Sequence, residues 1–154
     1  MAQPKRVGHL VLNVSDVEAS EKFYTEVLGF QISSKRPTAT FLTCGKIHHD
    51  LALFKTEDDA GPFRKGQVGL NHFAVQIEDM DALQDIYHRL KKHGVEISRT
   101  IDHGMTNSVY FSDPDGIELE FFCNSTQTTE EGLAIMGAAD RQNKELALED
   151  VAVS

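Results

Sequence analysis

The chain contains an internal repeat, and this repeat constrains the fold more than any other feature of the sequence. One segment starts at His9 with HLVLNVSD, and a second starts at His72 with HFAVQIED. The correspondence continues as far as Tyr24 and Tyr87, at a constant offset between the two copies. An internal repeat is the signature of a supersecondary unit that is used more than once. The sequence therefore predicts two copies of one structural module.

Each copy has the same order of predicted elements. It opens with alternating apolar residues, which is the period of a half-buried strand. Asp16 and Asp79 then supply N-cap candidates for two amphipathic helices, over residues 17–28 and 80–93. Three short strands follow each helix. They are expected over residues 30–33, 38–44 and 49–55 in the first copy, and over residues 95–99, 108–112 and 117–122 in the second.

These elements predict the α+β fold class, with two tandem βαβββ modules over about residues 7–55 and 70–123. A chain of 154 residues has the size of one ordinary domain, so both modules are expected to belong to one domain over residues 1–123. Residues 56–69 form a linker that is longer than a tight connection requires. Residues 124–154 form a polar C-terminal tail that we expect to be helical or disordered.

Charge and composition exclude several classes of partner. The net charge of −9 argues against nucleic acid and against an anionic membrane surface, because both attract basic patches. No apolar run approaches the roughly 20 residues of a membrane span, and the N-terminus lacks the apolar core of a signal peptide. Cys44 and Cys123 lack metal-binding spacing and suit reduced thiols. We therefore expect a cytoplasmic protein without disulfides.

The two histidines that open the repeats are candidate metal ligands. Strand periodicity places His9 on the same face as Asn13, and His72 on the same face as Gln76. A single histidine on a strand is more often structural than a ligand. Two histidines at the same position of a repeat, while most of their neighbours differ, favour a metal that both would share.

The last predicted strand can supply a carboxylate ligand. Glu118 and Glu120 are two positions apart and point to the same face of that strand. An acidic pair that faces solvent is the ordinary interpretation. One inward carboxylate beside two imidazoles would instead form a 2-His-1-carboxylate triad, which leaves coordination positions open on non-haem Fe(II) for substrate and dioxygen.

The second repeat also carries a motif that resembles a known family. Residues 101–120 read IDHGMTNSVYFSDPDGIELE, with His103, Tyr110, the Pro114-to-Gly116 turn and Glu120 in order. This pattern is similar to the signature of the type I extradiol dioxygenases in the vicinal oxygen chelate superfamily. The resemblance covers about residues 7–123 and implies one open, barrel-like sheet around a metal site.

The resemblance implies a site and an activity. The metal ligands would be His9, His72 and Glu120, with Glu118 as an acidic neighbour. The metal would be Fe(II), with Mn(II) as the other possibility because the same ligands accept both. The reaction would be extradiol ring cleavage of a catechol with dioxygen, as in a 2,3-dihydroxybiphenyl 1,2-dioxygenase. His49 follows another histidine, as in the double-histidine strand of the ring-cleaving enzymes.

Three further residues receive roles from the same resemblance. His49 would carry a proton on the dioxygen side of the site, and His103 and Tyr110 would hydrogen-bond a substrate oxygen. Histidine suits proton transfer because its ordinary pKa lies near neutral pH. Taken singly, His103 would be interpreted as a loop residue and Tyr110 as a core aromatic. Their position in the motif favours function instead.

Other functions are compatible with the same fold. The superfamily also contains metal-dependent lyases, isomerases and transferases, as well as non-catalytic binding proteins, so the fold does not decide the function. No cationic anchor is evident among the residues expected to face the site, which favours a neutral aromatic diol as substrate. Because paired modules can close within one chain or between chains, a homo-oligomer is expected.

Overall fold

The computed structural model describes residues 1–150 and divides the chain into two compact units. Unit 1 spans Met1–Phe63 and unit 2 begins at Arg64. The boundary lies inside the expected linker, which contains no helix or strand between residues 56 and 71. Within the described residues, no helix is long and apolar enough to cross a membrane.

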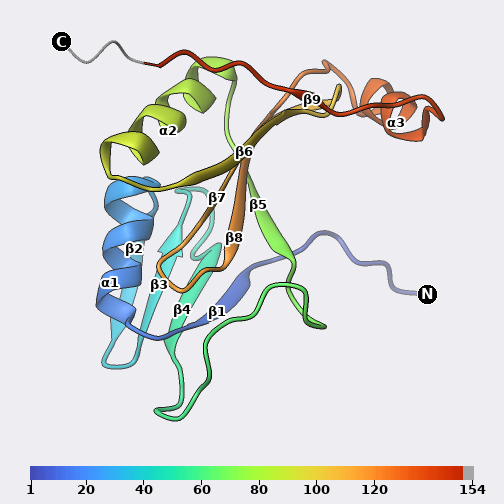
Figure 1. The fold of residues 1–154 in the computed structure, drawn as a ribbon. Helices are drawn as coiled ribbons and strands as arrows, with labels where there is room; N and C mark the ends of the chain where they lie inside the picture. Colours follow the sequence, from blue (N-terminus) through green and yellow to red (C-terminus); the bar gives the residue numbers. More distant parts are fainter. Residues whose placement is uncertain (151–154) are drawn as a thin grey trace. The chain divides into compact units, whose positions relative to one another are not determined.

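Unit 1 is a four-stranded sheet with one helical segment (Figure 1). The strand order is β1-β4-β3-β2, in which β1 and β4 are parallel and the other neighbours are antiparallel. This is the βαβββ order that the repeat predicts. Its elements are β1 (Leu10–Val14), α1 (Val17–Lys22), the π-helical turn η1 (Phe23–Val27), β2 (Gln31–Arg36), β3 (Ala39–Thr43) and β4 (Leu51–Lys55).

Local sequence explains the helical segment of unit 1. Asp16 is the N-cap of α1, and its carboxylate accepts hydrogen bonds from the backbone N–H groups of Glu18 and Ala19. The segment then widens into η1, and Gly29 ends it with φ +85°. The apolar side of this segment packs with the sheet. The most buried apolar side chains of unit 1 include Val14, Tyr24, Leu42, Leu51 and Leu53.

Unit 2 repeats the same order and adds a C-terminal extension (Figure 1). Its strand order is β5-β8-β7-β6-β9, in which β5 and β8 are parallel. The extension contributes the edge strand β9, which pairs with β6. The elements are β5 (His72–Gln76), α2 (Met80–Lys92), β6 (Ile97–Asp102), β7 (Thr106–Ser112), β8 (Glu118–Asn124), α3 (Thr129–Gly137) and β9 (Lys144–Glu145).

Helix α2 provides the apolar cover of the second sheet. Its N-cap is Asp79, whose carboxylate accepts from the backbone N–H of Ala82, and its buried residues are Leu83, Ile86 and Leu90. These side chains recur at helical spacing, so they form one stripe that packs on β7 and β8. The opposite face of the sheet is left for polar side chains, and these form the candidate site.

The structure confirms the mixed α+β class and both βαβββ modules. Helix α2 matches the expected range 80–93 within one residue, and the strands match within about three residues at each end. The strands form two sheets, one in each unit, and neither sheet is a closed barrel. In the tail, residues 129–137 are helical, and residues 151–154 lie outside the part of the chain that the structure describes.

Candidate active site

A histidine and a glutamate meet on the polar face of the unit 2 sheet. The parallel register of β5 and β8 places His72 beside Glu118 and Ala74 beside Glu120, so the side chains of His72 and Glu120 share a face. The Nε2 atom of His72 lies 3.1 Å from Oε2 of Glu120. Glu120 is 9% exposed, and the imidazole is partly exposed. The pair therefore joins a partly exposed imidazole to a largely buried carboxylate.

Neighbouring side chains orient both members of this pair. The Nδ1 atom of His72 lies 2.9 Å from Oδ1 of Asn71, an oxygen that can accept a proton carried on Nδ1. The hydroxyl of Ser108 donates to the other oxygen of Glu120 at 2.6 Å. Partners that fix the outer atoms of ligand side chains in this way are typical of metal sites.

The geometry of the pair fits a metal ion. A proton on Nε2 of His72 would donate to the Glu120 carboxylate. With the proton on Nδ1 instead, where Asn71 can accept it, Nε2 and Oε2 are two lone-pair donors that a cation can bridge. Adjacent ligand atoms around an ion bound at about 2.1 Å are about 3 Å apart, close to the separation found here. Imidazole nitrogen and carboxylate oxygen suit Fe(II) and Mn(II).

Glu118, two positions earlier, is committed to other partners. Both of its oxygens accept from the guanidinium of Arg99, at 2.8 and 3.1 Å, and Lys65 donates to it at 2.8 Å. The bond with Arg99, opposed by burial and supported by Lys65, lowers the pKa of Glu118 to about 2. A carboxylate held between two cations has little capacity left for a metal. The structure therefore favours Glu120 over Glu118 as the ligand.

Tyr110 and His103 lie beside the His72 and Glu120 pair. The register of β7 and β8 pairs Tyr110 with Glu120, and the rings of Tyr110 and His72 are 5.8 Å apart. The Tyr110 hydroxyl lies 2.9 Å from Nε2 of His103. Burial, together with the nearby Glu120 carboxylate, raises the pKa of Tyr110 to about 12. Tyr110 therefore stays protonated at neutral pH and acts through hydrogen bonds.

Arg99 adds a cation to this face. Its guanidinium lies over the Tyr110 ring, 3.9 Å from the ring centroid, while it also binds Glu118. Such stacking is favourable because the ring face is electron-rich. Sequence reasoning did not identify this cation, whose charge is paired with Glu118.

Unit 1 carries a separate cluster of aromatic rings. The ring of His49 lies 4.4 Å from the ring of His9, 4.5 Å from that of His48 and 5.5 Å from that of Phe41. Partial loss of solvent around His49, followed by the charges of His48 and His9, lowers its pKa below the ordinary value. Neutral imidazole is the form of histidine that can accept a proton or bind a metal.

The structure thus brings the proposed residues together in two groups. His72, Glu120, His103 and Tyr110 lie together in unit 2, and His9 lies with His49 in unit 1. Within residues 1–150, no three histidine, cysteine or acidic side chains form a single metal-binding cluster. The predicted three-ligand set is therefore divided between the units.

Sequence reasoning missed several residues around the site. Ser108 lies two positions before Tyr110 on β7, so the period of the strand could have identified it. Asn71 lies next to His72 and could also have been considered. Arg99 and Lys65 have no local signal, because their contacts with Glu118 depend on tertiary structure.

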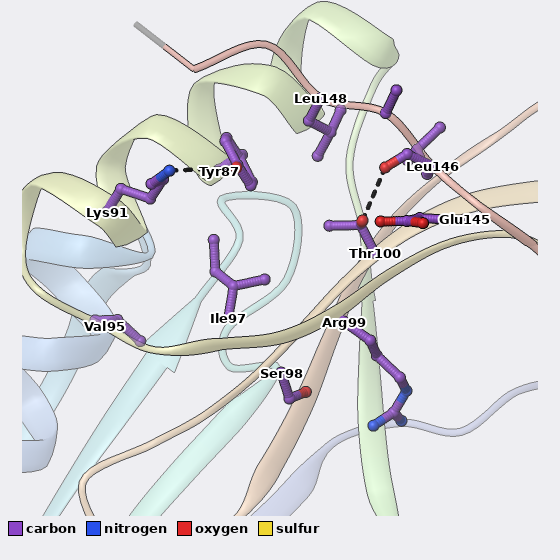
Figure 2. Close-up of a pocket in the computed structure, with 11 residues that line it drawn as sticks. Tyr87, Lys91, Val95, Ile97, Ser98, Arg99, Thr100, Glu145, Leu146 and Leu148 are labelled. Carbon is purple, nitrogen blue, oxygen red and sulfur yellow. Dashed lines mark hydrogen bonds between the residues drawn. The ribbon is translucent and has the colours of Figure 1, made fainter. Parts of the chain in front are cut away.

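Unit 2 also has a cavity away from these residues. It has a volume of about 610 Å³ and is formed by α2, β6 and the segment that follows β9. Figure 2 shows Ile97 and Thr100 on the side of β6 that faces α2, whereas Arg99 points to the other side. The hydroxyl of Thr100 donates to the carbonyl of Leu146 at 2.8 Å and anchors the final segment. This cavity is thus on the face opposite to the candidate site.

Comparison with known proteins identifies relatives that carry this fold. The chain is 34% identical over 137 residues to biphenyl-2,3-diol 1,2-dioxygenase 3 of Rhodococcus globerulus. This alignment covers 88% of this chain and 72% of the relative. The chain is also 32% identical over 120 residues to glutathione transferase FosA of Serratia marcescens. This alignment covers 77% of this chain and 81% of the relative. The structure of a glyoxylase/bleomycin resistance protein/dioxygenase domain from Frankia sp. EAN1pec superposes with a TM-score of 0.67 at 26% identity, covering 79% of this chain and 99% of that one.

The family assignment follows from the extent of these matches. Residues 6–121 match the profile of the family described as Glyoxalase, and this range includes both modules and all six candidate site residues, namely His9, His49, His72, His103, Tyr110 and Glu120. The C-terminal extension, with α3 and β9, lies outside the matched range. The chain belongs to the Glyoxalase/Bleomycin resistance protein/Dioxygenase superfamily.

Proposed function

We propose that this protein is an extradiol dioxygenase, which cleaves the ring of an aromatic diol with dioxygen at a 2-His-1-carboxylate Fe(II) site. The observation that carries the proposal is the side-by-side placement of a ligand pair and a hydrogen-bonding pair on one sheet face. His72 and Glu120 form the first, and His103 and Tyr110 form the second. A relative that is 34% identical is named as a biphenyl-2,3-diol dioxygenase, which supports the same activity.

The proposed metal ligands are His9, His72 and Glu120. The first lies in unit 1 and the other two in unit 2. His9 could come from the same chain or from a second copy, because paired modules can also be exchanged between chains in a homo-oligomer. When bound, Fe(II) would supply the redox-active centre that lets catechol and dioxygen react, and Mn(II) is the alternative ion.

Three side chains would handle protons and orientation around that centre. His49 would carry a proton on the dioxygen side, and its lowered pKa keeps it neutral and able to accept one. Tyr110 would hold a substrate oxygen by a hydrogen bond. His103, bonded to the Tyr110 hydroxyl, would keep that hydroxyl in place. Within unit 2, substrate would be positioned beside Tyr110 and the pair formed by His72 and Glu120.

A metal-binding experiment tests this arrangement. We expect His9→Ala, His72→Ala and Glu120→Ala each to lose stoichiometric iron, while Glu118→Ala retains it, because Glu118 is bound to Arg99 and Lys65 instead. Iron content is measured after gel filtration, and circular dichroism checks folding. Retention of iron in Glu120→Ala together with its loss in Glu118→Ala would show that the ligand assignment is wrong.

One alternative has specific support. The similarity to a glutathione transferase covers 81% of that relative, so a metal-dependent transferase is the second candidate. A transferase could share the three ligands, but it would have no need for His49, His103 and Tyr110 as a proton-handling set. Unchanged transferase activity in variants of all three, with no oxygen uptake on any catechol, would favour this alternative. A lyase, an isomerase or a non-catalytic binding protein would show neither activity.

A further inference from the structure

The C-terminal extension reaches the candidate site through a strand register. β9 pairs with β6 in antiparallel fashion, with Glu145 opposite Ile101 and Lys144 opposite Asp102. One step further along the same register brings residue 143 opposite residue 103. The Oδ1 atom of Asn143 accordingly lies 2.9 Å from Nδ1 of His103. A side chain outside the range that matches the superfamily thus contacts a candidate site residue.

Other contacts of the extension hold the turn that carries His103. The turn joins β6 to β7, and its backbone is closed by a bond from the His103 N–H to the Thr106 carbonyl. Gly104 adopts φ +84°, and a Cβ atom at this position would lie only 3.1 Å from Ile135 of α3. The N–H of Ser125 also donates to the Met105 carbonyl. The turn is therefore packed against the extension.

The hydrogen-bond partners of His103 indicate which of its ring nitrogens donates and which accepts. The amide oxygen of Asn143 can only accept, so the proton of a neutral His103 is held on Nδ1. Nε2 then carries a lone pair and can only accept from the Tyr110 hydroxyl, 2.9 Å away. With its proton directed to His103, the Tyr110 oxygen presents lone pairs to its remaining neighbours.

We infer that Asn143 is a positioning residue, which fixes the Nδ1–H tautomer of His103 and so makes the Tyr110 hydroxyl the donor in its hydrogen bond with Nε2. Given the proposed function, on which this part rests, the Tyr110 oxygen would then present its lone pairs to a substrate hydroxyl, which would donate to it.

A competing arrangement of protons exists in the same structure. The Glu120 carboxylate lies close enough to Tyr110 to oppose its ionisation, and it could accept the Tyr110 proton instead. His103 would then donate from Nε2 to the Tyr110 oxygen, and Asn143 would have to offer its amide N–H₂ to Nδ1. The two arrangements place the neutral imidazole proton on different nitrogens, so they can be distinguished directly.

The test is the tautomer of His103 in the full chain, read from long-range ¹H–¹⁵N spectra of ¹⁵N-labelled, chelator-treated protein. His103→Gln identifies the His103 signals. We expect the wild type to show a protonated Nδ1 and an unprotonated Nε2 above the pH at which the ring is charged. Asn143→Ala should shift His103 toward the Nε2–H tautomer, because Nδ1 loses the hydrogen-bond partner that it has among residues 1–150. Asn143→Asp should restore the Nδ1–H tautomer, because a carboxylate also accepts.

The matched control is Asn107→Ala, an identical substitution on β7 whose side chain contacts Met80 instead. It should leave the His103 signals unchanged. An Nε2–H tautomer in the wild type would overturn the inference, and so would an unchanged tautomer in Asn143→Ala. Because the spectra require neither metal nor catechol, these outcomes are independent of the oxygen-uptake result that decides the proposed function.

If the proposed function holds, activity provides a second test of the positioning role. Asn143→Ala should lower kcat by about 10-fold, which is less than the roughly 10²- to 10⁴-fold that a general acid/base group itself contributes, while Asn143→Asp recovers most of the loss. Iron content should be the same in both variants, because neither touches a proposed ligand. Equal losses of activity in the two variants would indicate a merely structural role and would contradict the inference.

Discussion

The substitution Glu118→Gln separates the structural carboxylate of β8 from the proposed ligand. It removes the negative charge that Arg99 and Lys65 share, and it retains the size of the side chain. Because Glu118 is only 4% exposed, water cannot fully replace the interactions that its carboxylate makes with the two cations. We expect lower stability together with unchanged iron binding. The same substitution at Glu120 should have the opposite result, with iron lost and stability less affected.

The magnitude follows from the pKa of Glu118. A lowering from 4.5 to about 2 on folding corresponds to about 3 kcal/mol of stability, at about 1.4 kcal/mol per pKa unit. Since Arg99 and Lys65 are partly exposed, solvent screening makes this an upper bound. The folded-state pKa is the lower one, so the contribution is complete above the unfolded value of 4.5 and is lost as the pH falls toward 2. At pH 3 only about 1 to 2 kcal/mol should remain.

The assay is urea unfolding of chelator-treated protein at pH 7, 5, 4 and 3, followed by circular dichroism. The difference in unfolding free energy between the wild type and Glu118→Gln should be largest at pH 7 and should narrow below pH 4.5. Glu96→Gln is the matched control, since Glu96 is an exposed residue of the same unit. A difference that is constant with pH, or that grows in acid, would refute the assignment of a low pKa to Glu118.

Three further outcomes are expected. Glu21→Ala should destabilise the protein by about 1 to 3 kcal/mol in urea unfolding, because the buried Thr40 hydroxyl, which donates to Glu21 at 2.8 Å, would lose its partner. Asp79→Ala should cost about 1 kcal/mol in the same assay, through loss of the α2 N-cap, and Asp79→Ser should recover most of it. His49→Gln should retain iron and catechol binding in anaerobic titrations but slow ring cleavage by about 10²- to 10⁴-fold in stopped-flow mixing with oxygen. An equal loss of catechol binding would argue against a proton-carrying role for His49.

Periodicity in the sequence accounts for most of the fold. The repeat predicts both βαβββ modules, and strand alternation correctly places Glu120 and Glu118 on one face of β8. The two residues cannot be distinguished by sequence alone, because their roles depend on which cations reach them. Only the folded sheet shows that Arg99 binds Glu118 while Ser108 binds Glu120.

Arg99 illustrates a second reason why sequence reasoning falls short. Simple alternation along β6 would place Arg99 on the same face as Ile97, which faces α2. The pairing of β6 with β7 shifts register between Ile97 and Arg99. As a result, Arg99 lies opposite Tyr110, and the two side chains are on the same face of the sheet. A β-bulge of this kind reverses the alternation after it, and the local sequence contains no clear signal for it.

The C-terminal extension illustrates a third reason. Its polar composition suggested a helix or disorder, whereas β9 pairs with β6 and the following residues contact α2. Glu149 receives a hydrogen bond from Gln84 through its carbonyl, and Asp150 forms an ion pair with Lys91. Each contact joins residues about 60 positions apart, so no local pattern predicts them.

Oxygen uptake by the Fe(II)-loaded full chain tests the proposed dioxygenase activity most directly. Protein with one iron per three-ligand site is mixed with simple, aryl-substituted and polycyclic catechols, while an electrode records oxygen and a spectrophotometer records the yellow ring-opened product. We predict that at least one catechol is consumed with one oxygen molecule per ring, and that His72→Ala, which lacks a proposed ligand, is inactive. If the loaded wild type consumes no oxygen with any of them, the proposed dioxygenase activity is contradicted.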